Sequence, residues 1–242
     1  MATATAIRIC TSIVTDPRLL SLLHFGDSAF PTGGYAHSFG LETYCQSGQV
    51  RTREELERFL VAQLEGQTGP CDATAAVGVL RAATSGDLRR CRAVDDTLEA
   101  MKVVREFREA SRQMGRQTLR VAATLTSDAR LVAYAGDVDQ SLAPGHHAVA
   151  YGLAAAALGW LPEAAATAYL YSATALLVGA ALRLLPMGQL EGQRVLWALH
   201  PVIERVAREA ASRDVDDLWS FAPGIELAGI RHASLDMRLF RS

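Results

Sequence analysis

Nineteen consecutive uncharged residues, AAATAYLYSATALLVGAAL, lie between Glu163 and Arg183. A helix of this length is long enough to cross a lipid bilayer. Eight of the nineteen are alanine, however, and no cluster of Lys or Arg marks a cytoplasmic end. A helix that is apolar on all sides can instead be the central helix of a soluble bundle. We favour this buried helix, bounded by Pro162 and Pro186, and expect no membrane partner. A small membrane-associated helical protein is the alternative.

The rest of the chain also favours helices, because alternating runs of Val, Ile and Thr are nearly absent. Thr52 precedes a helical pattern and has Glu55 three residues later, which is the spacing of a capping box. Residues 127–145 are predicted to interrupt the helices, and Pro201 to kink or break one. The sequence therefore predicts one all-α domain over residues 1–242. We expect a single bundle of about nine to eleven helices around the Ala/Gly/Leu-rich central helix, after a flexible N-terminus of about 16 residues.

Charge, cysteine and histidine content exclude several classes of function. The chain has 24 Lys and Arg against 26 Asp and Glu, a net charge of -2, so we expect no nucleic-acid partner. Its four cysteines form no CxxC pair and its six histidines show no metal-ligand spacing, which indicates reduced thiols and no metal site. The first residues lack the apolar core of a signal peptide, so we expect a cytoplasmic protein.

The segment FPTGGYAHSFGLE, residues 30–42, allows three interpretations. A phosphate-binding Walker loop is disfavoured because the glycines are wrongly spaced, Leu41 stands in place of lysine, and no strand precedes. A serine esterase could use Ser38 in AHSFG, but the strand that positions such a nucleophile is also missing. The third interpretation is a rigid loop in which Pro31, Gly33 and Gly34 set the backbone conformation. Such a loop either docks a helix on the core or is presented to a partner, and we expect no enzyme activity.

Four blocks of the chain resemble, in the same order, those of the urease accessory protein F (UreF) family. They are DSAFPTGGYAHSFGLE, EFREASRQMGRQTL, YLYSATALLVGAALRLLPMGQLEGQRVL and the closing RLFRS. The resemblance runs from about Leu19 to the last residue. One block departs from the family, because this chain has HHAVAYG where the family often has HFPVVFG.

The resemblance implies an all-α homodimer that is not an enzyme. In the family picture it is an adaptor between a nickel-carrying GTPase (UreG) and a scaffold protein (UreD, or UreH). It couples GTP hydrolysis to the delivery of nickel into apo-urease. Nickel then passes through the complex, and no cofactor is bound tightly.

The resemblance also implies partner-binding roles for three segments of this chain. In PMGQLEGQ, Pro186 ends the apolar helix, the glycines allow a close turn, and the glutamines present amides. The tail, residues 230–242, is expected to be mobile alone and to order on the scaffold protein; the alternative is that it packs back on its own core. The predicted partner-binding residues are Pro31, Gly33, Gly34, Tyr35, His37, Ser38, Gly40, Glu42, Pro186, Gly188, Gln189, Gly192, Gln193, Arg231, Arg238, Leu239, Phe240 and Arg241.

Overall fold

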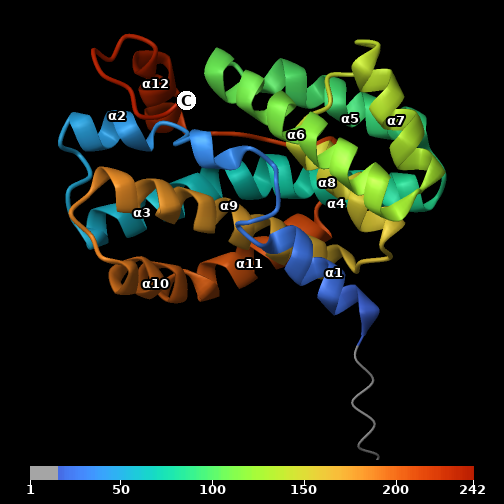
Figure 1. The fold of residues 1–242 in the computed structure, drawn as a ribbon, viewed down its shortest axis with the longest axis horizontal. Coiled ribbons are helices and arrows are strands. Elements are labelled where there is room, and N and C mark those ends of the chain that lie inside the picture. The colour runs from blue at the N-terminus through green and yellow to red at the C-terminus, as the bar shows by residue number, and fades with distance from the viewer. Residues whose placement is uncertain (1–15) are drawn as a thin grey trace, which may run out of the picture.

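The structure, a computed structural model, describes residues 16–242, and helices make up its regular structure with no strand in this range (Figure 1). The α-helices are α1 (Pro17–Gly26), α2 (Leu41–Gln46), α3 (Arg53–Gln63), α4 (Thr74–Thr84), α5 (Leu88–Met101), α6 (Arg105–Thr126), α7 (Ala129–Asp139), α8 (His147–Ala157), α9 (Pro162–Leu184), α10 (Gln189–Ala198), α11 (His200–Ser212) and α12 (Pro223–His232). Two short 3₁₀ turns, η1 (Gly34–Ala36) and η3 (Val215–Asp217), and a π-helical segment, η2 (Leu64–Ala73), complete the set.

The predicted all-α bundle is confirmed. Because η2 joins α3 to α4 without a break, the twelve α-helices of the described residues form eleven continuous helices, within the predicted range. The flexible N-terminus predicted over about residues 1–16 lies outside the described residues, except for Asp16, whose side chain caps α1.

Local sequence signals account for several helix ends. The Thr52 side chain accepts a hydrogen bond from Glu55 N at 3.3 Å, and the Glu55 carboxylate accepts one from Thr52 N at 3.1 Å, so the capping box is confirmed. The helix is interrupted at Leu199, between α10 and α11, so the break predicted near Pro201 is confirmed.

The predicted interruption at 127–145 is wrong in part, because α7 occupies residues 129–139. Leu131, Tyr134 and Val138 are buried along one side of α7, and this packing outweighs the weak helix propensity of glycine within it.

Helix α9 is the centre of the bundle and packs against α1, α4, α10 and α11 (Figure 1). It is long and apolar enough to cross a membrane by length and composition, and half of its most apolar window is buried in the bundle. Its remaining side carries mostly small residues that are only partly covered. We call this side the open face of α9; it consists of Ala164, Ala168, Tyr171, Ala175 and Gly179.

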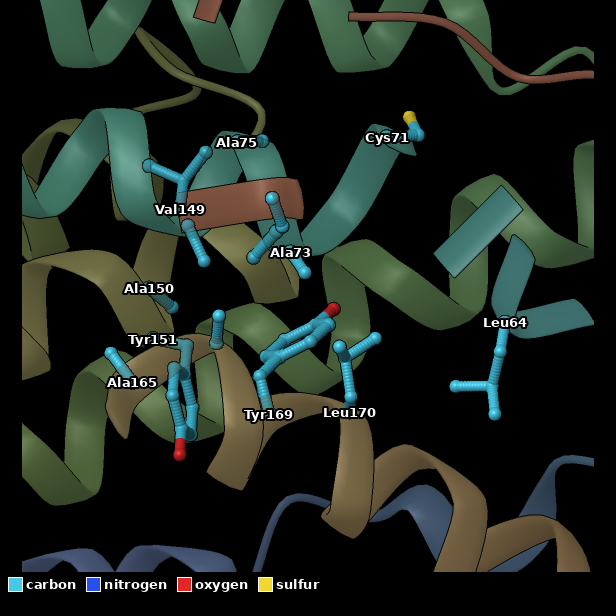
Figure 2. Close-up of a cluster of buried hydrophobic side chains, with 14 of the residues drawn as sticks. Leu64, Cys71, Ala73, Ala75, Val149, Ala150, Tyr151, Ala165, Tyr169 and Leu170 are labelled. Carbon is cyan, nitrogen blue, oxygen red and sulfur yellow. The ribbon is translucent and has the colours of Figure 1, made fainter. Parts of the chain in front are cut away.

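The core beside α9 combines small residues with the aromatic rings of Tyr151 and Tyr169 (Figure 2). Tyr151 of α8 and Tyr169 of α9 meet edge to face, with ring centroids 5.2 Å apart. Gly152 lets α8 approach α4 so closely that a Cβ atom there would overlap the backbone of Ala76. The alanine-rich sequence of α8 and α9 therefore provides close helix packing.

The π-helical segment η2 contains Pro70, which has no N–H group to donate to a regular helix. Two carbonyl oxygens of η2 accept hydrogen bonds from the chain that crosses it after η3. Phe221 N donates to Gly66 O at 2.7 Å, and Trp219 N lies 3.5 Å from Pro70 O. The irregular helix is thus tied to a segment distant in sequence.

Candidate functional site

The loop that precedes α2 owes its shape to glycines with different roles. Gly33 has a φ angle of +81°, in the left-handed region that favours glycine. Gly34 was expected to need the same conformation, and this expectation is wrong, because its φ angle is not positive. Gly34 is instead a close-packing position, since a Cβ atom there would overlap the Leu176 side chain and lie 3.2 Å from Met114 Cε. The loop is therefore pressed onto α6 and α9.

The part of the tail that follows α12, residues 233–242, runs back along this loop and pairs with its backbone. Ser38 N and Phe39 N donate to Ser242 O at 2.6 and 3.0 Å, and Arg241 N donates to Ala36 O at 2.8 Å. Phe240 is buried. The tail was expected to be mobile in the isolated chain; in the structure it packs on its own core, which was the alternative. Its engagement of a partner stays a prediction.

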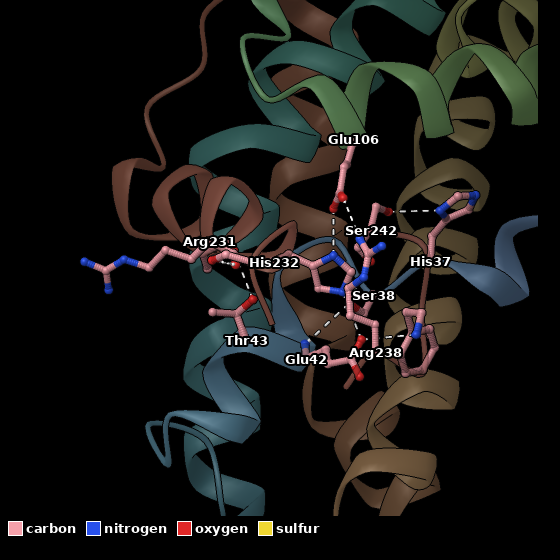
Figure 3. Close-up of polar contacts among 12 residues, drawn as sticks. His37, Ser38, Glu42, Thr43, Glu106, Arg231, His232, Arg238 and Ser242 are labelled. Carbon is pink, nitrogen blue, oxygen red and sulfur yellow. Dashed lines mark hydrogen bonds and ion pairs between the residues drawn. The ribbon is translucent and has the colours of Figure 1, made fainter. Parts of the chain in front are cut away.

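An ionic cluster built around the buried His232 and Glu42, which we call the His232 cluster, holds the tail in place. It consists of Glu42, Glu106, His232 and Arg238 (Figure 3). His232 is 0 % exposed; its Nε2 lies 2.9 Å from Glu42 Oε2, and its Nδ1 lies 2.6 Å from Glu106 Oε2. Arg238 Nη1 donates to Glu106 Oε1 at 3.0 Å. Both ring nitrogens of His232 thus lie within hydrogen-bond distance of a carboxylate oxygen.

Glu42 connects this cluster to the tail backbone. It is 2 % exposed, and its two carboxylate oxygens accept hydrogen bonds from Leu239 N at 2.7 Å and Phe240 N at 3.1 Å. Glu42 was expected to contact a partner directly. Its position shows an internal role instead, because the residues that it bonds cover it.

Arg183, near the end of α9, joins the loop to the tail from the other side. Its guanidinium carbon lies 3.8 Å from the ring centroid of Tyr35 and 4.0 Å from that of Phe240. Its Nη2 also donates to Tyr35 O at 2.6 Å. Cation–π contacts of this kind add stability beyond the buried area alone. The loop, the tail and the end of α9 therefore meet at one corner of the molecule.

The predicted partner-binding residues divide into a buried and an exposed group. The buried residues are Gly34, His37, Ser38, Gly40, Glu42, Gly192 and Phe240. The exposed residues are Pro31, Gly33, Tyr35, Pro186, Gly188, Gln189, Gln193, Arg231, Arg238, Leu239 and Arg241. Gln189 and Gln193 lie on α10, which packs on α9 through Gly192, whereas Tyr35 lies against Arg183 at the end of α9 and Arg231 lies on α12.

We call the exposed part of the corner where the loop, the tail and α9 meet the loop–tail surface; it comprises Tyr35, Met237, Arg238, Leu239 and Arg241. Tyr35 is 76 % exposed and Leu239 58 %. Three residues behind it had no signal in the sequence, namely Glu106, Arg183 and His232. They lie far apart in the chain, and only the fold brings them together.

The geometry around Ser38 differs from that of a hydrolase nucleophile. Ser38 is buried and its Oγ donates to Ser242 O at 2.7 Å, while His37 Nδ1 lies 2.9 Å from Ser242 Oγ. Burial, with a smaller effect of nearby Arg241, lowers the pKa of His37 to about 4. The preceding residues form a 3₁₀ turn rather than a strand, so no nucleophile elbow is present at this position. Within residues 16–242, no three His, Cys, Asp or Glu side chains are grouped to hold a metal ion.

Comparison with known proteins gives consistent matches over nearly the whole chain. A family model described as UreF matches residues 50–200. The chain is 32 % identical over 225 residues to a urease accessory protein UreF of Bacillus sp. (strain TB-90), covering 93 % of this chain and 99 % of that protein. It is 35 % identical over 223 residues to the UreF of Paenarthrobacter aurescens (strain TC1), covering 92 % and 97 %. It is 33 % identical over 221 residues to that of Trichodesmium erythraeum (strain IMS101), covering 91 % and 95 %.

Proposed function

This chain belongs to the UreF family of urease accessory proteins, and we propose that in urease maturation it is a cytoplasmic, non-catalytic adaptor. It bridges the nickel-carrying GTPase (UreG) and the scaffold protein (UreD/UreH), and it couples GTP hydrolysis to the delivery of nickel into apo-urease. Nickel is the cargo of the complex rather than a resident cofactor of this chain.

The observation that carries this proposal is the loop–tail surface. The loop and the tail expose aromatic and apolar side chains there, Tyr35, Met237 and Leu239, together with two arginines, Arg238 and Arg241. Tyrosine and arginine are the residues that most often dominate binding energy in protein interfaces. The His232 cluster fixes the backbone of this surface before a partner arrives, which lowers the entropy lost on binding.

The test is binding of the purified chain to the scaffold protein, measured by biolayer interferometry. Leu239→Ala and Arg241→Ala remove exposed side chains without removing any member of the His232 cluster. Each should weaken binding by about 1–2 kcal/mol, or roughly 5- to 30-fold. Val132→Ala, which truncates an exposed residue of α7, is the matched control and should change nothing. Affinity as high for both tail variants as for the control would contradict the proposal.

We also propose that the chain is a homodimer and that the open face of α9 forms its interface. Small residues allow two helices to approach closely, and this face is apolar but only partly covered in the single chain. Gly179→Glu tests this, because a Cβ atom at Gly179 meets nothing within 4 Å and the single chain should tolerate it. Light scattering should then report a monomer, whereas Thr124→Glu on the exposed side of α6 should stay dimeric. A dimeric Gly179→Glu variant would exclude this interface.

A further inference from the structure

A cavity of about 80 Å³ lies beneath the loop that carries Thr32 and Phe39. Its polar lining, which we call the polar wall, comes mainly from η2 and its neighbours: Gln63, Gln67, Thr68, Asp72, Lys102 and Tyr169. Its apolar lining includes Met114 of α6 and Leu176 of α9. Thr32 and Ser172, which also line the cavity, are only partly buried. The cavity thus offers both polar and apolar groups to an occupant.

Two side-chain amides in the polar wall leave one acceptor and one donor free. Gln63 Nε2 donates to Gln67 Oε1 at 3.1 Å. Gln63 is only 7 % exposed, and its buried Oε1 has no hydrogen-bond partner among the described residues. The Gln67 amide nitrogen is left as a donor. Buried polar atoms are nearly always hydrogen-bonded, so a free acceptor beside a free donor indicates a ligand that supplies both.

The charges in the polar wall cancel. Lys102 Nζ lies 2.7 Å from Asp72 Oδ1, and both side chains are largely buried. Burial alone would lower the pKa of Lys102, but the Asp72 carboxylate raises it above its ordinary value, so Lys102 is charged and paired. Burial lowers the pKa of His147 to about 4, which leaves that ring neutral at pH 7. A charged occupant would be an uncompensated buried charge, which is costly.

We propose that this cavity binds a small neutral primary amide with a short alkyl group. The amide oxygen accepts from Gln67 Nε2, the amide N–H donates to Gln63 Oε1, and the alkyl group lies against Met114 and Leu176. The cavity volume of about 80 Å³, measured as the space open to the centres of water molecules, is several times the roughly 10–15 Å³ that one water needs on this measure, so a molecule the size of acetamide fits inside it. This site goes beyond the proposed adaptor function and does not depend on it.

The experiment is a titration of the full chain with acetamide, followed by NMR of ¹³C-labelled Met and Leu methyl groups. The Met114 and Leu176 signals should shift and saturate, and acetate, which has the same shape but a negative charge, should give no saturable shift. Gln67→Leu should weaken binding at least tenfold, and Gln113→Leu, on the exposed side of α6, should leave it unchanged.

Three outcomes would overturn the proposal. The first is methyl shifts that do not saturate in the wild-type chain, which are expected if the cavity holds only water. The second is equal binding of acetate and acetamide, and the third is wild-type affinity in Gln67→Leu. The first two need no variant, so the test does not depend on Gln67→Leu folding normally. Where that variant does not fold, Gln63→Met, which removes the acceptor Gln63 Oε1, should also weaken acetamide binding.

Discussion

Replacing Glu42 by glutamine should destabilise the protein and release the tail. The Glu42 carboxylate accepts from two backbone N–H groups and faces the His232 ring, and it is almost completely buried. A glutamine keeps only one acceptor oxygen, and its NH₂ group would then face a donor. Breaking one side of a buried ion pair costs about 3–5 kcal/mol, and each hydrogen bond to a charged group contributes about 1.5–3 kcal/mol. Because the freed tail can reach solvent, we expect the free energy of unfolding to fall by about 3–5 kcal/mol rather than by the sum of these terms.

Two measurements separate a loss of global stability from a release of the tail. Denaturant unfolding followed by circular dichroism gives the free energy of unfolding, and the melting temperature should fall by about 6–20 °C. Hydrogen exchange of the amides of Ser38, Phe39, Leu239 and Phe240 reports on the tail, and these four amides should lose protection first. The control is Glu109→Gln, since Glu109 is a largely exposed residue of α6, and it should change stability by less than about 0.5 kcal/mol.

Two results would refute this reasoning. If Glu42→Gln is no less stable than Glu109→Gln, the His232 cluster does not hold the tail. If global stability falls but Leu239 and Phe240 exchange at the wild-type rate, Glu42 supports α2 rather than the tail.

Four further predictions follow from the same contacts. Deleting Met237–Ser242 should lower the melting temperature and deprotect the loop, rather than leave the core unchanged, because the tail fills a buried site. Gly33→Ala should lower the free energy of unfolding by about 1–2 kcal/mol, measured by thermal unfolding, because Gly33 has a positive φ angle. Gly34→Val should lower it further, because the valine side chain would overlap Leu176 and crowd Met114. Burial lowers the pKa of His37 and His147 to about 4 in the folded state, so between about pH 6.5 and pH 4 the unfolded chain binds more protons than the folded one. The free energy of unfolding should therefore fall as the pH is lowered through this range, and His37→Gln should reduce the slope of that free energy against pH by about one proton. Burial raises the pKa of the three free cysteines in residues 16–242 to about 12, so a thiol reagent should label them only on unfolding, and labelling at native rates would contradict this.

Helix positions could be predicted from the sequence because their signals are local. The capping box at Thr52, the proline at the start of α9 and the uncharged run after it each act within a few residues. The missed helix α7 shows the limit of such signals, since its stability comes from burial of Leu131 and Tyr134 against distant helices.

The candidate site could be predicted only in part, because its key contacts are not local. His232 bonds to carboxylates 126 and 190 residues away, and no spacing in the sequence encodes that meeting. The tail composition was compatible with both a mobile and a packed segment. The deciding contact is the pair of hydrogen bonds that Glu42 accepts from the tail backbone, which depends on where the fold places α2.

The π-helical segment η2 sets the rotational phase between α3 and α4. Helix α3 buries one stripe, around Leu56 and Leu60, whereas α4 is buried on nearly all sides, and both must keep their register with the core although they belong to one continuous helix. Each residue of an α-helix turns the chain by about 100°. Losing one residue between 64 and 73 would therefore rotate one stripe out of the core, even if every side chain in the segment were kept. In evolution the length of this segment should therefore be kept, and insertions or deletions within it should be rejected.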